Sequence, residues 1–117
     1  MLSKSEIIRF SKLKQKKYRN SDKLFIAEGK RLIEEALKSK YIPKLISITE
    51  QFAQRERTFK DKLKKTQIRL EIVNERDIDK ICSTKNPQGI FAVFEIPDKI
   101  DHVFVPEGYV TLFPVGG

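Results

Sequence analysis

Residues 12–37 constrain the fold of this chain more than any other stretch. A basic run leads into the apolar segment 24–27, a Glu28-Gly29 turn follows, and apolar residues then recur at helical spacing. A short apolar run bounded by polar residues is typical of a strand that is buried on both faces. The order of strand, turn and helix predicts an α/β domain in which a cationic surface is joined directly to the core.

The same alternation continues along the chain. The apolar runs of strand length are residues 24–27, 45–48, 68–73 and 90–96. The segments between them carry apolar residues at helical spacing, as in 50–65. Strands that alternate with helices favour helices on both faces of one sheet. We therefore expect a compact three-layer α/β/α sandwich with an N-terminal basic helix, although the sequence leaves the strand order open.

Side chains that cap helices mark several boundaries. Ser3 followed by Glu6 is a capping box, so a first helix is expected over about residues 6–16. The polar residues 20–22 favour a turn and should break that helix. Two further N-caps are expected at Thr49 and Asn74.

Positive charge is concentrated near the N-terminus. Residues 1–20 contain seven Lys or Arg and one Glu, and they account for most of the net charge of +8. A localised cationic stretch attracts polyanions without regard to base sequence. The alternative is a solubilising surface that binds nothing in particular. Tyr18 lies within the run and could stack on a base, or it could cover the core.

Composition limits the chemistry. The chain has one cysteine and one histidine, so we expect no internal disulfide and no zinc site, and a reducing cytoplasmic setting fits. No apolar run approaches the ~20 residues of a membrane helix. At 117 residues the chain has the size of one domain. The Pro-containing segment 98–117 is expected to be a linker or the start of a further domain, which leaves residues 1–97 as the folded unit.

Two local features are candidate binding elements. Gly29 allows a close approach at the start of a helix, where free N–H groups could receive a phosphate oxygen beside Lys30 and Arg31. The competing interpretation is a plain tight turn. Residues 83–89 form a polar loop in which Lys85 and Gln88 could contact a ligand, or which could simply connect two elements.

These motifs together resemble a known family. The segments that carry the resemblance are residues 12–19, 25–29, 31–36 and 84–89. In this order they are similar to the N-terminal substrate-binding domain of the SpoU/TrmH family of RNA ribose 2′-O-methyltransferases, over about residues 3–97. The resemblance implies a fold like that of ribosomal proteins that bind kink-turn RNA. It also implies a role in gripping ribosomal or transfer RNA.

The resemblance has a limit. In that family, S-adenosylmethionine and the catalytic arginine belong to a C-terminal knotted domain, which also forms the dimer. This sequence stops at Gly117, and it contains neither the Asn-Gly-Arg motif nor a glycine-rich cofactor loop. We therefore expect no catalytic, cofactor-binding or metal-binding residue in the chain, and a monomer that binds structured RNA without methylating it.

The predicted RNA-binding surface combines all of these elements. The basic run would neutralise phosphates, the helix that starts after Gly29 would bind backbone, and the polar loop would contact a splayed base. Its members are Lys12, Lys14, Lys16, Lys17, Arg19, Lys30, Arg31, Lys85 and Gln88. Two alternatives stay open: a stand-alone RNA-binding protein of the ribosomal type, and a protein-interaction module that recognises an acidic partner.

Overall fold

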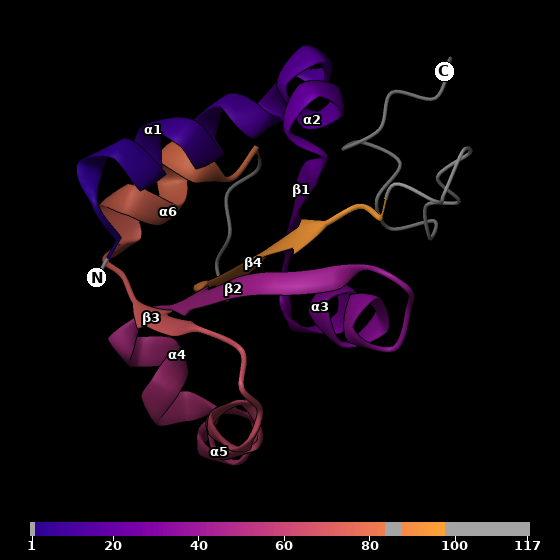
Figure 1. Cartoon of the computed structure of the whole chain (residues 1–117). Coiled ribbons are helices and arrows are strands. Elements are labelled where there is room, and N and C mark those ends of the chain that lie inside the picture. Colours follow the sequence, from indigo (N-terminus) through magenta and orange to yellow (C-terminus); the bar gives the residue numbers. More distant parts are fainter. Residues whose placement is uncertain (1, 84–87, 98–117) are drawn as a thin grey trace.

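A computed structural model describes residues 2–83 and 88–97. One four-stranded sheet lies between two layers of helices (Figure 1). In chain order the elements are α1 (Lys4–Ser11), the 3-10 helix η1 (Lys12–Lys14), α2 (Lys16–Asp22), β1 (Leu24–Glu28), α3 (Lys30–Leu37), β2 (Ile42–Ile48), α4 (Glu50–Arg55), α5 (Arg57–Lys65), β3 (Leu70–Ile72), α6 (Glu75–Ile81) and β4 (Ile90–Glu95). The predicted α/β/α sandwich is confirmed.

The sheet is mixed, with the strand order β1-β4-β2-β3. β4 lies between β1 and β2 and is antiparallel to both, whereas β2 and β3 are parallel. The last strand therefore inserts between the first two. Because β1 and β2 run in the same direction on either side of β4, the helix that follows each of these strands begins at the same end of the sheet.

Alternation along the strands divides the core in two. In β1, Phe25 and Ala27 face α3, α4 and α5, while Leu24 and Ile26 face α1, η1 and α6. β4 is apolar at every position from Ile90 to Phe94 and contributes to both clusters. A strand buried on both faces has to be apolar throughout, and this explains why these two runs were recognisable from the sequence.

The N-terminal helix differs from the prediction. Helical structure is interrupted at Gln15, which is extended, and it resumes as α2 through residues 20–22, where a turn was expected. The cause is Arg19, whose Nη1 donates 2.8 Å hydrogen bonds to the carbonyls of Leu13 and Lys14. Those carbonyls would otherwise accept from the next helical turn. The helix ends instead at Lys23, in the left-handed region at φ 56°.

Two other element boundaries also differ from the prediction. The predicted helix 50–65 is divided into α4 and α5 at Glu56, whose carboxylate binds the Lys30 ammonium at 3.0 Å. β2 begins at Ile42 instead of Leu45, and its register shifts between Pro43 and Leu45. Proline has no N–H for the ladder, so an irregularity at this position is expected.

The predicted caps are confirmed. Ser3 and Glu6 form a capping box, with the Glu6 N–H donating to the Ser3 hydroxyl at 3.1 Å and the Ser3 N–H donating to the Glu6 carboxylate at 3.0 Å. Thr49 and Asn74 accept from backbone N–H groups three residues later. Each such cap contributes ~1 kcal/mol to stability.

Glu6 gives the fold a pH dependence. Hydrogen bonds from Arg69, and then from the Ser3 backbone, lower the pKa of the Glu6 carboxyl to about 2. Because the folded-state pKa lies below the unfolded one, the stabilisation is complete above about pH 4.5 and is lost as the pH falls toward 2. The pair is partly exposed to solvent, which reduces the effect to about 1 kcal/mol.

We expect Glu6→Gln to lower the free energy of unfolding by about 1 kcal/mol at pH 7 and by less than half of that at pH 2. Urea denaturation followed by circular dichroism at the two pH values measures this difference. Glu34→Gln is the control, because Glu34 is exposed on α3. An equal loss for Glu6→Gln at both pH values would contradict the assignment.

Candidate nucleic-acid interface

The sheet separates the predicted binding residues into two groups. The basic run lies in the layer of α1, η1 and α2, whereas Lys30 and Arg31 begin α3 in the opposite layer (Figure 1). The two groups also lie at opposite ends of β1, because α2 ends just before this strand and α3 begins just after it. The expectation of one continuous surface is therefore wrong.

Four predicted cations of the basic run remain available to a ligand. The side chains of these residues are exposed and make no ion pair within residues 2–83 and 88–97; they are Lys12, Lys14, Lys16 and Lys17. The interruption at Gln15 places two of them before a corner in the chain and two after it. Exposed ammonium groups of this kind can neutralise phosphates.

Arg19 has a different role from the one predicted. Its side chain is only 2% exposed, and its guanidinium holds the carbonyls of Leu13 and Lys14. Burial lowers the pKa of this guanidinium from its ordinary value. A phosphate cannot reach the group in this structure, so Arg19 shapes the turn that presents the lysines and does not itself contact a ligand.

The start of α3 is occupied by the protein itself. The Lys30 N–H donates to the Gln88 side-chain oxygen at 2.9 Å, which takes the position predicted for a phosphate. The Lys30 ammonium binds Glu56 at 3.0 Å and lies over the Phe59 ring at 5.2 Å. Arg31 is open to solvent, with 91% of its side chain exposed, and pairs weakly with Glu35 at 3.8 Å.

Gln88 and Gly89 join the ends of three strands. The Gln88 carbonyl accepts from Arg55 at 2.7 Å, and the Gly89 carbonyl accepts from the Thr49 N–H at 2.9 Å. Together with the bond to Lys30, these contacts fix the turns that begin α3 and α4. Gln88 therefore has a structural role in addition to any binding role, while Lys85 lies outside the described residues.

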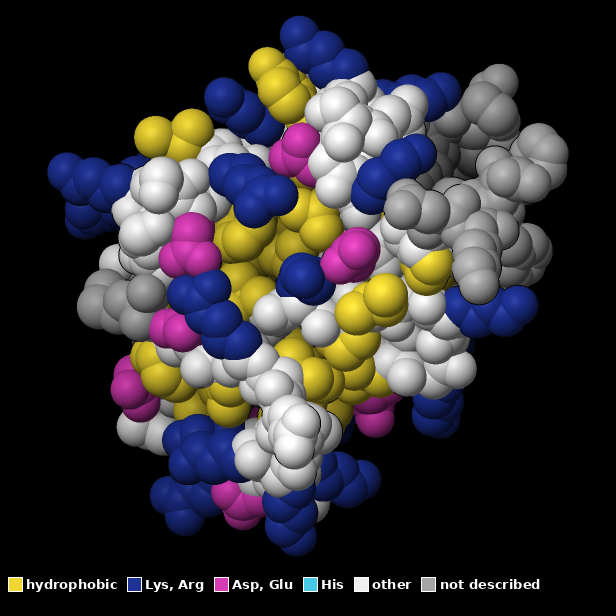
Figure 2. Space-filling view, viewed as in Figure 1, with side chains coloured by type: hydrophobic (Ala, Val, Ile, Leu, Met, Phe, Trp, Pro, Cys, Tyr) yellow, Lys and Arg dark blue, Asp and Glu magenta, His cyan; other side chains and the backbone are white. Residues whose placement is uncertain are grey.

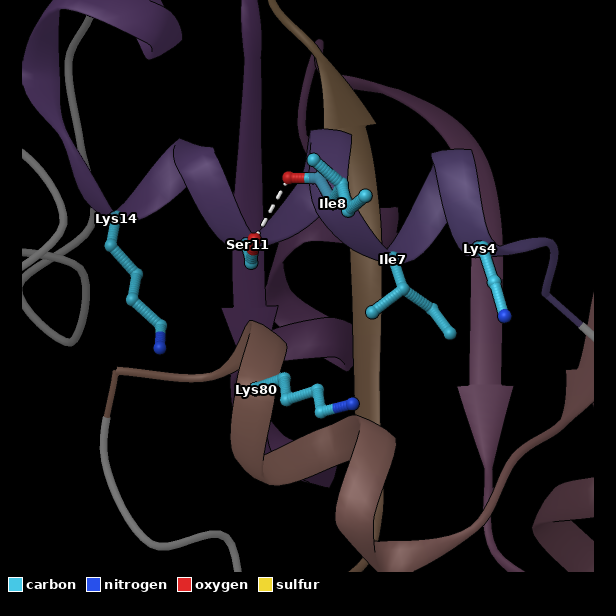
Figure 3. Close-up of a pocket in the computed structure, with 6 residues that line it drawn as sticks. All are labelled: Lys4, Ile7, Ile8, Ser11, Lys14 and Lys80. Carbon is cyan, nitrogen blue, oxygen red and sulfur yellow. Dashed lines mark hydrogen bonds between the residues drawn. The ribbon is translucent and has the colours of Figure 1, made fainter.

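A groove of about 500 Å³ follows the side of α1 that faces α6 (Figure 3). Ile7 and Ile8 supply apolar surface, and Figure 3 shows the side chains of Lys4, Lys14 and Lys80 around it. Lys80 was missed from the sequence, because its proximity to the basic run arises only from the packing of α6 against α1. This groove extends the cationic surface beyond the N-terminal run.

A second groove, of about 350 Å³, lies on the α2 side of α1. Its lining residues are Ser5, Ile8, Arg9, Lys12, Tyr18 and Asp22. Ile8 is 56% exposed and borders both grooves, so it forms a ridge between them. Tyr18 packs against the core, and the ammonium groups of Lys12 and Lys17 lie 5.4 and 5.0 Å from its ring centroid. Such exposed cation–π contacts contribute ~0.5–1 kcal/mol each.

Lys and Arg side chains gather at two places in the space-filling view, over the α1–α2 layer at the top and over α5 at the bottom (Figure 2). The two regions differ in their apolar content. Ile8 and Tyr18 accompany the cations of the first region, whereas Phe52 and Phe59 beneath the second are buried. Flat apolar bases joined by phosphates need both kinds of surface, which favours the α1–α2 layer.

The two grooves beside α1 do not suit S-adenosylmethionine. S-adenosylmethionine carries a sulfonium cation, and both grooves are lined by Lys or Arg, which would repel that charge. Within residues 2–83 and 88–97, no cluster of His, Cys, Asp and Glu could hold a metal. No helix in the same residues has the length and apolar character to cross a bilayer.

Comparison with known proteins identifies the class of domain. Residues 4–92 match the family model of the MRM3-like substrate binding domain, and the chain belongs to this family. The resemblance based on the sequence motifs is thereby confirmed. No curated protein shows a significant match to the chain.

Solved structures give the same result. An AdoMet-bound rRNA methyltransferase from Sinorhizobium meliloti is similar with a TM-score of 0.57 and 27% identity, over 83% of this chain and 36% of that one. A protein from Porphyromonas gingivalis, described as an RNA methyltransferase of the TrmH family, has a TM-score of 0.63 and 25% identity, over 88% and 39% of the two chains.

A third structure, an RNA 2′-O ribose methyltransferase, has a TM-score of 0.69 at 24% identity, over 89% and 39%, and it supports the fold alone. The chain thus spans little more than a third of the length of these proteins. The likeness to kink-turn-binding ribosomal proteins and the domain boundary at residue 97 stay predictions.

Proposed function

We propose that this substrate-binding domain binds structured ribosomal or transfer RNA through the layer formed by α1, η1 and α2. We call this layer, together with Lys80 of the adjoining helix α6, the basic face; its cations are Lys4, Arg9, Lys12, Lys14, Lys16, Lys17 and Lys80. The observation that carries the proposal is the exposure of these side chains, five of which line two grooves that also offer apolar surface; Lys16 and Lys17 extend the same charged surface along α2. Arg19, which is buried, and Lys30, which lies in the opposite layer and binds Glu56, are not included.

The proposed contribution to catalysis is positioning. In a complete methyltransferase, S-adenosylmethionine would supply the methyl group for a ribose 2′-hydroxyl. The basic face would hold the RNA backbone through its phosphates and so raise the effective concentration of the target ribose near the catalytic domain. Because phosphate contacts carry no sequence information, these contacts would fix the placement of the RNA without selecting its sequence.

The double substitution Lys16→Glu and Lys17→Glu tests the basic face. We expect its affinity for a structured RNA to fall by about tenfold or more, because two phosphate contacts become repulsive. The dependence of log affinity on log salt concentration should also become shallower by about 1.5, at ~0.7–0.9 per lost phosphate contact. Filter binding or fluorescence anisotropy over a salt series measures both quantities.

Lys64→Glu with Lys65→Glu is the matched control. It makes the same charge change on exposed residues of α5, in the opposite layer. We expect this control to keep the wild-type salt dependence and most of the affinity. Equal losses in the two double variants would place the RNA elsewhere or show only a bulk charge effect. Arg31→Glu should change the RNA affinity little. A large loss of affinity in this variant would show that the start of α3 does contact RNA, as the sequence predicted.

An acidic protein partner is the second candidate, because the same cations would also attract carboxylates. RNA is supported as the ligand if a glutamate-rich peptide displaces it only when the peptide carboxylates are in large excess over the RNA phosphates. A peptide that binds more tightly than any RNA would favour the interaction module.

A further inference from the structure

We propose that the groove between α1 and α2 holds an unpaired base of the bound RNA, stacked on Tyr18. The inference rests on the proposed function and adds to it the form of RNA that is recognised. It concerns the second groove described above, whose lining includes an aromatic ring, an aliphatic ridge, cations and the carboxylate of Asp22.

The ring of Tyr18 lies where a flat ligand in the groove could stack on it. It packs against the core cluster below the α1 layer, so the core holds it in place, and it remains partly exposed toward the groove. Ile8 adds an exposed apolar wall on the α1 side. Bases stack on fixed aromatic rings without regard to sequence, because every base has a π-face. Only a base outside a continuous helix can present that face.

The cations near the ring match the nucleotide that would carry this base. Lys12 and Lys17 rest on Tyr18 in the free protein, at 5.4 and 5.0 Å from the ring centroid. Both have long, exposed side chains that can leave the ring and meet the phosphates on either side of an inserted base. A stacked base would thus replace two weak cation–π contacts, and the displaced ammonium groups would gain phosphate partners.

Asp22 distinguishes this groove from a plain phosphate site. Its carboxylate lies in the lining, 3.5 Å from Arg9 Nε and within 3.2 Å of the Ser21 hydroxyl. A carboxylate repels phosphate but accepts hydrogen bonds from N–H groups on a base edge. Guanine presents two adjacent N–H donors on its Watson–Crick edge, whereas uracil presents one. The groove should therefore prefer an unpaired guanine to an unpaired uracil.

The test uses the full chain and three RNA hairpins that differ only at one position: fully paired, with a single bulged G, or with a single bulged U. The variants are Tyr18→Phe, which keeps the ring, Tyr18→Leu, which keeps apolar packing without it, and Asp22→Asn. A 2-aminopurine placed at the bulge reports stacking through the quenching of its fluorescence. Thermal melting by circular dichroism checks that each variant is folded.

We expect the wild-type chain and Tyr18→Phe to bind the bulged hairpins more tightly than the paired one and to quench 2-aminopurine. Tyr18→Leu should bind the bulged hairpins roughly tenfold more weakly, lose the quenching and keep its affinity for the paired hairpin. Asp22→Asn should lose the preference for G over U. If Asp22 only opposed phosphates, this variant would bind all three hairpins more tightly by the same factor, which would overturn the base-edge contact.

The inference fails if Tyr18→Leu distinguishes bulged from paired RNA as the wild type does, or if 2-aminopurine is quenched equally by both. It also fails if a glutamate-rich peptide binds more tightly than the bulged hairpins and is indifferent to Tyr18→Leu. The failure of the proposed function looks different, because then the wild type binds none of the three hairpins in a salt-dependent way.

Discussion

Replacing Gly89 by alanine is expected to lower the free energy of unfolding by about 2–5 kcal/mol, from backbone strain and steric overlap together. Gly89 has a φ of +78°, which side chains rarely adopt, and an added Cβ would lie 2.5 Å from the Thr49 hydroxyl oxygen. Thr49 is fully engaged, since it caps α4 and its N–H bonds the Gly89 carbonyl. Chemical denaturation at neutral pH measures the loss.

Gly29→Ala separates the two causes of this loss. Gly29 also has a positive φ, of +97°, but the nearest atoms that a Cβ there would meet belong to the Gln88 side-chain amide, at an ordinary contact distance of 3.6 Å or more. We expect a cost of about 1–3 kcal/mol from strain alone. The double variant Gly89→Ala with Thr49→Ala should cost less than the sum of its single changes, because the overlap disappears. Additive costs would show that the clash is absorbed elsewhere.

Arg19→Met is expected to destabilise the domain by about 2–4 kcal/mol, because the buried carbonyl of Leu13 and the partly buried carbonyl of Lys14 lose their donor. Removing a buried cation recovers part of its desolvation cost, which keeps the loss below the full penalty of two unmade bonds. The variant should also bind RNA more weakly, since the turn containing Lys12 and Lys14 is no longer held. Denaturation and RNA titration on the same sample measure both effects.

Arg9→Met is the matched control for this change. Arg9 is 59% exposed in its side chain and makes one ion pair with Asp22 at 3.5 Å, so stability should change by less than about 0.5 kcal/mol. Arg19→Lys should be intermediate in stability, because a single ammonium group replaces the rigid fork of the guanidinium. If Arg19→Met lowers RNA affinity without lowering stability, Arg19 contacts RNA and the assigned structural role is wrong.

The parts of the fold that could be predicted are those whose signals are local. The capping box at Ser3 and the caps at Thr49 and Asn74 each depend on contacts within a segment of four residues. The strands β1 and β4 are apolar throughout because both of their faces are buried. Helical layers on both sides of a sheet followed from the order of these segments.

The errors come from contacts between residues that are distant in the sequence. The sequence around Gly29 resembles an anion site, but the Lys30 N–H already has a partner in the structure. That partner is the side chain of Gln88, which lies 58 positions away in the sequence. In the sequence, Arg19 cannot be distinguished from the other cations of the basic run. Its structural role becomes evident only from its burial beneath the turn. Charge alone cannot distinguish a cation that faces solvent from one that bonds buried carbonyls.

The candidate site shows the same division. The lysines of the basic run were identified by their density, and their exposure agrees with that choice. The two grooves, the ridge at Ile8 and the contribution of Lys80 depend on how α1 packs between α2 and α6, and no local pattern encodes this packing.

Apart from Lys80 of α6, the lysines of the basic face are carried by helical pieces of eight, three and seven residues. Helices this short are not stable in water by themselves, so they depend on packing against the sheet for their structure. The lysines are consequently arranged before any RNA arrives, unlike those of a flexible basic tail, and docking requires little new ordering of the chain. Binding should then weaken abruptly at the melting temperature of the whole domain, and not gradually below it.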